Sequence, residues 1–170
     1  VFSKFLCQEI DGKEIRHYLL DMTRHTPRDF ISLMNSLKTF YTGDKMDRQQ
    51  IFSALRQYSI DYFEPEIRDE MVGYVDSADY EKFCSLVGLI RQREFSFSNL
   101  SSKADAEGMS HEALEDVLKA LYDCGAVGNK WGTPTGSNRY EFKFRNKNSS
   151  LDKSKTIVLH RGLWKALNLV

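Results

Sequence analysis

Several features that identify common protein classes are absent from this sequence of 170 residues. Its 3 cysteines, Cys7, Cys84 and Cys124, lie far apart and have neither the spacing of metal ligands nor that of a redox pair. This use of cysteine favours a reducing, cytoplasmic setting over a disulfide-stabilised secreted domain. There is also no secretory signal pattern and no apolar run long enough to cross a membrane, so we expect no membrane among its partners.

Signatures of common catalytic sites are absent as well. The sequence contains no Gly-x-x-x-x-Gly-Lys-Ser/Thr phosphate loop, no Gly-x-Ser-x-Gly elbow and no His-Glu-x-x-His zinc motif. The 4 histidines are scattered, and we expect His25 to stabilise a bend rather than to bind a metal. We therefore predict no metal site and no catalytic residue, and we do not expect this chain to be an enzyme by itself.

Charge is distributed unevenly, although Lys and Arg balance Asp and Glu overall. Residues 1–125 carry 15 Lys or Arg against 22 Asp or Glu, whereas residues 126–170 carry 9 against 2. A net charge of −7 is thus followed by one of +7. This asymmetry predicts a basic surface built from the C-terminal part of the chain.

The apolar spacing predicts a small bundle of three helices over residues 1–62. Thr26 and Asp29 have the spacing of a capping box, and Pro27 occupies the first helical position. Asp47 is placed to cap the third helix. Short turns join the three helices, which is typical of a compact lid-like bundle.

A second domain is predicted over residues 63–170. A joint is expected at Glu64-Pro65, because the residue before a proline avoids helical backbone angles, and the domain boundary is expected within 59–77. Its elements are then expected in the order helix, short strand, two helices and β-hairpin, over 77–91, 94–98, 99–107, 110–124 and 126–145, followed by a strand over 156–159 and a short helix over 161–169. This order is typical of a winged helix with a β-hairpin wing, so the predicted fold class is α+β, mainly helical.

Arg28 is an unusual residue for the first turn of a helix. The helix dipole already places positive partial charge there, so an acidic side chain is the usual choice. A guanidinium suits this position if it faces an anion, because it and the backbone amides then converge on one negative group. The alternative is that Arg28 pairs with a nearby carboxylate such as Asp21 or Asp29.

The predicted wing carries the second group of candidate functional residues. Those that could contact nucleic acid or a protein partner are Lys130, Trp131, Arg139, Lys143, Arg145 and Lys147. Trp131 is expected to be the most exposed aromatic residue and could anchor a partner. The helix over 110–124 is acidic and would repel phosphates, so contact with DNA would involve the wing. Alternatively, these side chains form a solvated strand face that keeps the sheet edge from pairing with other chains.

The sequence resembles the C-terminal part of bacterial P-loop ATPases of the STAND/AAA-like group. The likeness lies in the segment Thr-Arg-His-Thr-Pro-Arg-Asp-Phe at 23–30, in the helices over 31–58 and in the winged-helix pattern that ends at Leu167. In that family a small helical lid follows the nucleotide-binding core, and an arginine at the start of a lid helix contacts the bound phosphates. The resemblance implies that Arg28 is this nucleotide-sensing residue, with Arg24 as a weaker candidate.

The resemblance also implies that an ATPase core lies upstream of Val1, because this chain lacks a phosphate loop. ATP and magnesium are then expected to bind only with that core, and the isolated chain would bind ATP weakly or not at all and hydrolyse none. Our preferred interpretation is therefore a regulatory C-terminal portion of an ATPase, whose winged helix contacts a partner or restrains the core. The alternatives are a winged-helix DNA-binding protein that uses its basic wing, and a protein-binding winged helix with an inert helical extension.

Overall fold

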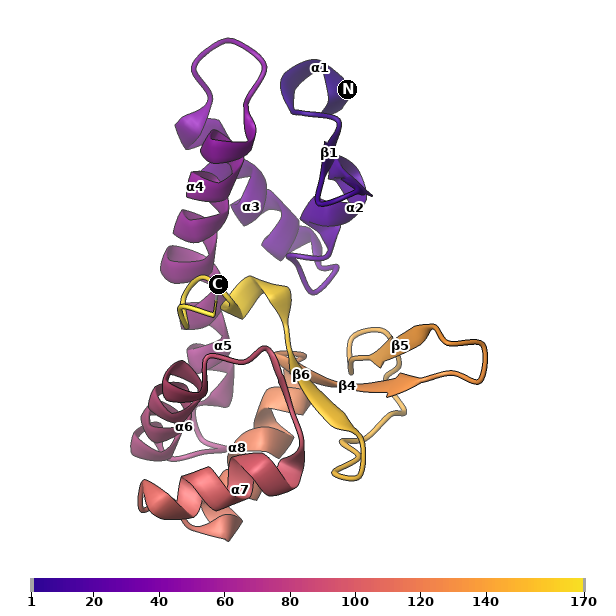
Figure 1. The fold of residues 1–170 in the computed structure, drawn as a ribbon. Coiled ribbons are helices and arrows are strands. Elements are labelled where there is room, and N and C mark those ends of the chain that lie inside the picture. The colour runs from indigo at the N-terminus through magenta and orange to yellow at the C-terminus, as the bar shows by residue number, and fades with distance from the viewer. Residues whose placement is uncertain (1, 170) are drawn as a thin grey trace. The chain divides into compact units, whose positions relative to one another are not determined.

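The computed structural model describes residues 2–169, apart from the side chains of residues 2 and 3. Helices predominate and the strands form small antiparallel sheets (Figure 1), so the predicted α+β, mainly helical class is confirmed. The chain divides into two compact units. Unit 1 holds the residues up to Pro65 together with Arg161–Ala166, and unit 2 holds Glu66–His160 together with the residues after Ala166.

Unit 1 contains the helices expected of the N-terminal bundle. Its elements are α1 (Phe2–Phe5), β1 (Glu9–Ile10), β2 (Lys13–Glu14), α2 (Ile15–Leu20), α3 (Pro27–Phe40), α4 (Arg48–Tyr58) and the π-helix η1 (Ser59–Phe63). Helices α3 and α4 pack against each other and bury Leu33, Leu37, Ile51 and Leu55. Each such side chain contributes about 1.5–3 kcal/mol when it leaves water, which makes this pair the centre of the unit's core.

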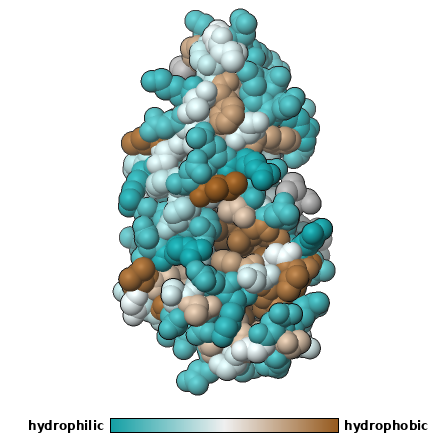
Figure 2. All heavy atoms as spheres, turned by 90° about the vertical axis from the view of Figure 1, so that its left-hand side faces the viewer, coloured by the Kyte–Doolittle hydropathy of each residue, from teal (hydrophilic) through white to brown (hydrophobic). Residues whose placement is uncertain are grey.

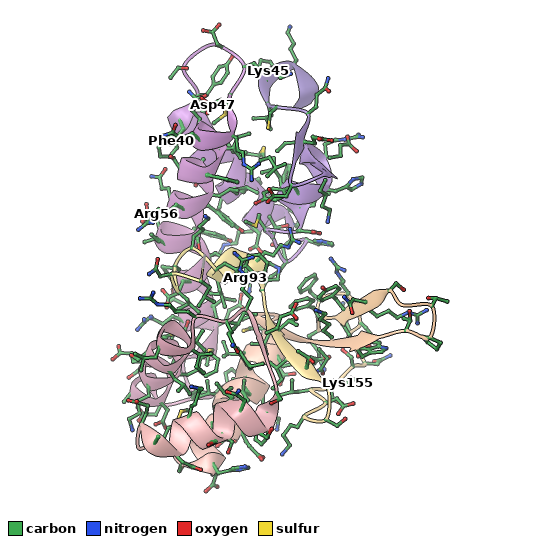
Figure 3. The ribbon with its side chains drawn as sticks, viewed as in Figure 1. Phe40, Lys45, Asp47, Arg56, Arg93 and Lys155 are labelled. Atoms are coloured by element: carbon green, nitrogen blue, oxygen red, sulfur yellow. The ribbon has the colours of Figure 1, made fainter. Side chains whose placement is uncertain are left out.

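The two predicted helix starts in unit 1 are confirmed. At the start of α3, the Thr26 hydroxyl accepts a hydrogen bond from the Asp29 amide at 3.1 Å, but the predicted capping box is only half formed because the Asp29 carboxylate accepts from Arg24 and Tyr62 instead. At the start of α4, Asp47 (Figure 3) and Gln50 form a complete capping box, with hydrogen bonds of 2.8 and 3.0 Å. These bonds satisfy amide groups for which a helix has no internal partner, so the two helices begin where the sequence indicates.

The helix break predicted at Glu64-Pro65 is wrong, because the chain remains helical there, although the boundary between the two units does fall between Pro65 and Glu66. Glu64 has φ −66° and ψ −46°, and α5 (Glu64–Met71) follows η1 without a break. Proline in a helix removes one amide donor and crowds the preceding turn. The wider turn of the π-helix directly before Pro65 relieves this crowding, which keeps the backbone helical over 48–71.

A short C-terminal segment belongs to unit 1. It includes the 3-10 turn η2 (Arg161–Leu163), and Ser59 holds it by donating its hydroxyl to the Gly162 carbonyl and accepting the Ala166 amide at 2.9 Å. A Cβ at position 162 would lie 2.7 Å from the ring of Phe63, so only glycine fits. The predicted helix over 161–169 is therefore shortened to one 3-10 turn, because the segment is shaped by its contact with η1.

Unit 2 has its helices and strands in the predicted order. They are α6 (Ser77–Ile90), β3 (Glu94–Phe95), α7 (Phe97–Ala106), α8 (His111–Asp123), β4 (Val127–Gly132), β5 (Asn138–Glu141) and β6 (Thr156–Leu159). The antiparallel sheet has the order β3-β6-β4-β5, in which β4 and β5 form the predicted hairpin. Strand β6 thus lies between β3 and β4, which leaves β5 at the edge of the sheet.

Two predicted strands of unit 2 are shorter than expected. The strand predicted over 94–98 ends at Phe95, because the Ser96 hydroxyl accepts the Asn99 amide at 3.2 Å and caps α7. The strand predicted over 139–145 ends at Glu141. Beyond it, buried Asn129 exchanges two hydrogen bonds, of 2.8 and 2.9 Å, with the backbone of Asp152 and so fixes the long loop before β6.

The surface is polar over most of the face drawn in Figure 2, where hydrophobic side chains occur as separate patches. Large exposed hydrophobic residues of unit 2 include Val72, Tyr74 and Leu89. Within residues 2–169, no helix has the length and apolar character that crossing a membrane requires.

Candidate functional site

The start of α3 is organised around a buried ion pair between Arg24 and Asp29. The Asp29 side chain is completely buried, and that of Arg24 is 7% exposed. The Arg24 Nε and Nη2 atoms each donate to the carboxylate at 3.1 Å, and the Arg24 backbone amide donates at 2.8 Å. The hydroxyl of Tyr62 donates a further bond of 3.0 Å, and the guanidinium lies over the ring of Phe63. The carboxylate therefore joins the bend before α3 to η1.

These donors keep the Asp29 carboxylate ionised despite its burial. Burial by itself would raise the pKa of Asp29, because it removes water from the charged form. The hydrogen bonds and charge of Arg24 outweigh that effect, with help from Tyr62, so the pKa lies below its usual value. Arg24 thus has a defined structural role as the internal counter-ion of Asp29.

Arg28 lies one position before Asp29, in the first turn of α3, and is exposed. Of the two carboxylates suggested as its partners, Asp29 receives Arg24 and Tyr62, whereas Asp21 receives Lys13 and lies 4.0 Å from Arg161; Arg28 itself has an interaction within the chain. The chain bends into this turn at His25, whose φ of +59° is rare for a residue with a side chain. The bend predicted at His25 is therefore present.

Two candidate cations of the predicted wing, Lys130 and Lys143, lie near acidic residues of unit 2. Lys130 Nζ lies 2.6 Å from Glu94 Oε2, and this hydrogen bond raises the pKa of the lysine. Lys143 Nζ donates to the Ser149 carbonyl at 2.7 Å and lies 3.7 Å from Asp123. The positive charge that the sequence concentrates after residue 126 is thus partly neutralised by acidic residues from earlier in the chain.

The other candidate residues of the predicted wing differ in their exposure and contacts. Arg139 and Lys147 are exposed, and the guanidinium of Arg145 lies over the ring of Phe144. The prediction that Trp131 is the most exposed aromatic is wrong, because Tyr74 is 81% exposed whereas Trp131 is half-buried. The cause is Lys155, whose ammonium lies 4.3 Å from the centre of the Trp131 ring.

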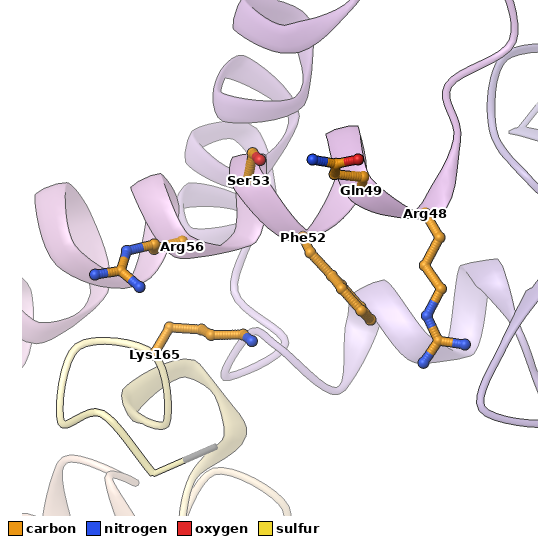
Figure 4. Close-up of a pocket in the computed structure, with 6 residues that line it drawn as sticks. All are labelled: Arg48, Gln49, Phe52, Ser53, Arg56 and Lys165. Atoms are coloured by element: carbon orange, nitrogen blue, oxygen red, sulfur yellow. The ribbon is translucent and has the colours of Figure 1, made fainter.

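The structure shows a basic pocket on α4 that the sequence analysis did not predict. It has a volume of about 430 Å³ (Figure 4) and is lined by Arg48, Gln49, Phe52, Ser53, Arg56 and Lys165. Five of these residues recur at helical spacing on one side of α4, which is a signal that the sequence contains. Lys165 comes from the distant C-terminal segment of unit 1, and only the fold brings it to this pocket.

Unit 1 also has an apolar pocket of about 320 Å³, lined by Phe5, Leu6, Met34, Leu37, Lys38, Tyr41 and Met46. It contains no pair of titratable groups suited to acid–base chemistry. Over residues 2–169, no cluster of His, Cys, Asp or Glu has an arrangement that could hold a metal ion.

Comparison with known proteins gives one partial match. Residues 1–65 match the family model described as a FunZ-associated C-terminal helical domain. The matched region ends where the first segment of unit 1 ends, and it includes Arg24, Arg28 and all of α3 and α4. A search of curated proteins and a search of solved structures returned no match to this chain.

Proposed function

We propose that this chain is a non-catalytic, regulatory C-terminal portion of a P-loop ATPase, in which Arg28 senses the phosphates of a nucleotide held by an upstream core. The observation that carries the proposal is the exposure of Arg28 in the first turn of α3, beside a buried ion pair that fixes this turn. The match of residues 1–65 to a C-terminal helical domain agrees with a position after another part of the protein.

The chemistry of the first turn suits an anion. The start of α3 carries the positive end of the helix dipole, and the guanidinium of Arg28 adds a full positive charge beside it, so both attract a phosphate group. An arginine can contact such a group through two parallel N–H donors. The phosphate loop and the magnesium ligands would come from the core, so ATP and magnesium act only in its presence.

The Arg24–Asp29–Tyr62 network connects the first turn of α3, which carries Arg28, to η1. Because Asp29 bonds both the bend before α3 and Tyr62 of η1, the first turn of α3 cannot shift without moving η1 or breaking these bonds. A change at Arg28 on nucleotide binding or hydrolysis would thus be transmitted along α4 and η1. In this proposal unit 2 then contacts a protein partner or restrains the core.

The test uses the natural protein with the sequence that precedes Val1. We expect Arg28→Ala to lower its ATPase rate at least tenfold, with Arg28→Lys intermediate, because lysine keeps the charge but loses the paired donors. Lys38→Ala, which removes an exposed cation from the other end of α3, is the matched control and should leave the rate unchanged.

Three results would overturn the proposal. They are an unchanged rate in Arg28→Ala, a natural protein without a phosphate loop, and tight ATP binding by the 170-residue chain alone in a calorimetric titration.

A further inference from the structure

The C-terminal segment Arg161–Ala166, which we call the strap, belongs to unit 1 although unit 2 precedes and follows it in the sequence. Leu163 near its centre is buried. Ser59 of η1 bonds the strap at two points, the Gly162 carbonyl and the Ala166 amide. The chain therefore leaves unit 2 for this short segment and then returns, so that both ends of the strap continue into unit 2.

Arg93 of unit 2, labelled in Figure 3, bonds the chain on both sides of the strap. Its carbonyl accepts the Leu159 amide at 2.9 Å, and its Nε atom donates to the Leu169 carbonyl at 2.8 Å. The side chains of Leu159 and Leu169 are both buried. One residue of unit 2 thus holds both ends of the strap, so the strap is a closed loop rather than a loose tail. A displacement of either end has to be taken up by the few residues between them.

Two neighbouring residues of η1 connect the strap to the buried ion pair before α3. The Phe63 ring lies so close to Gly162 that no Cβ fits there, and its centre is 5.5 Å from the Arg24 guanidinium. The Tyr62 hydroxyl donates to Asp29 at 3.0 Å. All these residues belong to unit 1. A continuous set of packed and hydrogen-bonded side chains therefore leads from the strap through η1 to the first turn of α3.

The π-helical form of η1 makes this connection sensitive to the strap. A π-helix is rare and occurs mostly as a single turn, frequently at functional sites. In η1, Ser59, Tyr62 and Phe63 all contact segments outside the helix. Because few sequences adopt this form unaided, such outside contacts stabilise it. Loss of the contacts with the strap would let η1 relax, and would change the positions of Tyr62 and Phe63 relative to Asp29 and Arg24.

We infer that the strap is a regulatory device through which unit 2 controls the setting of the first turn of α3. When unit 2 holds both ends of the strap, η1 keeps the Arg24–Asp29 pair in place beside Arg28. When either end is released, η1 loosens and so does that turn. The inference rests on the proposed function in one respect, namely that the turn senses phosphate.

The test is amide hydrogen exchange, measured by NMR on the 170-residue chain. Two amides report on the two ends of the path: that of Ala166, bonded to Ser59, and that of Arg24, bonded to Asp29. Arg93→Gln removes the bond to the Leu169 carbonyl from an exposed position of unit 2. We expect the Ala166 amide to exchange about tenfold faster and the Arg24 amide about threefold faster, since one hydrogen bond is lost directly and its effect weakens along the path. The matched control is Arg91→Gln, at an exposed arginine two positions away, which should change neither rate.

Ser59→Ala perturbs the same path from within unit 1. It removes both bonds to the strap, so the exchange of the Arg24 amide should increase more than in Arg93→Gln. Its control is Ser36→Ala, which removes a hydroxyl that bonds only within α3 and should not affect Arg24. The Leu37 amide, at the other end of α3, serves as the internal reference in every variant and should keep its rate.

The inference fails if Arg93→Gln accelerates exchange at Ala166 but leaves Arg24 unchanged, because the strap would then not act on α3. It also fails if the Leu37 amide is accelerated as much as that of Arg24, which would indicate a general loss of stability in unit 1. Equal effects of Arg91→Gln and Arg93→Gln would be a third contradiction. These measurements need no nucleotide, so the strap and the sensing role of Arg28, tested by the ATPase rate, can fail separately.

Discussion

Both units of this protein have ion pairs at the surface, such as Arg16–Glu14 in unit 1, but they differ because unit 1 also has a fully buried pair. Unit 1 buries one ion pair, Arg24–Asp29, and surrounds the carboxylate with four donor bonds. Unit 2 forms its ion pairs at the surface, as between Lys153 and Glu115, whose side chains are 48% and 37% exposed. A similar pair of charges thus holds the bend before α3 to η1 in unit 1, whereas in unit 2 it joins two exposed side chains.

The difference follows from hydration. A buried carboxylate has lost the water that would stabilise its charge, so every donor that replaces water becomes necessary. A surface carboxylate keeps most of its water, and its attraction to a neighbouring lysine is screened. An ion pair therefore contributes most to stability where water cannot reach the charge that remains after one partner is removed.

The largest expected effect is that of Asp29→Ala. It leaves the buried guanidinium of Arg24 without its counter-ion, and we expect the free energy of unfolding of unit 1 to fall by about 3–5 kcal/mol. The 2 tryptophans allow each unit to be measured alone in urea, since Trp164 lies in unit 1 and Trp131 in unit 2. A Trp131→Phe background reports on unit 1, and a Trp164→Phe background reports on unit 2.

The control for this experiment is Asp44→Ala, which removes an exposed carboxylate of unit 1. It should change the urea midpoint very little. If Asp29→Ala lowered stability by no more than this control, the buried pair would not have the structural role assigned to it.

A smaller effect on the stability of unit 1 is expected when the pH is lowered. Because the pKa of Asp29 in the folded chain is lowered below the usual value of about 3.9, the ionised carboxylate stabilises the fold. This contribution is fully present above the unfolded pKa and is lost as the pH falls through the folded pKa. We expect the difference in urea midpoint between the wild type and Asp29→Asn to be constant from pH 7 to 5 and to shrink below pH 4. A difference that stays constant down to pH 2 would contradict the assigned pKa direction.

The smallest effect is expected from Lys153→Ala in unit 2. It removes the 2.6 Å contact with Glu115, but both side chains remain hydrated. The urea midpoint reported by Trp131 should not change measurably, and high salt should not alter this result. A clear loss of stability would show that the surface pairs of unit 2 also support its fold, and the comparison between the units would fail.

Local features of the sequence were sufficient to predict much of the fold. Thr26 and Asp47 marked helix starts correctly, because a side-chain cap involves residues only three positions apart. Ser110 likewise caps α8 through the Ala113 amide. The helix break predicted at Glu64-Pro65 was wrong, because the π-helix that accommodates the proline has no simple sequence signature.

The candidate site was only partly visible in the sequence. The place of Arg28 in the first turn of a capped helix was predicted, since capping is a local property, whereas its exposure was not. The structural use of Arg24 was not anticipated, although Asp29 is only 5 positions away, because the burial of this pair depends on the tertiary structure. The half-buried state of Trp131 was missed for a similar reason, since Lys155 comes from the far end of a long loop.

The sequence alone thus determined where most helices begin, the order of the elements and the amount of charge in each part of the chain. The tertiary structure alone decided which charges neutralise one another and which remain available to a ligand. It buried Arg24 against Asp29, paired Lys130 with Glu94, and brought Lys165 to Arg56 on α4. The physical reason is that hydration and Coulomb attraction depend on distance and burial in space, whereas the sequence specifies only separation along the chain.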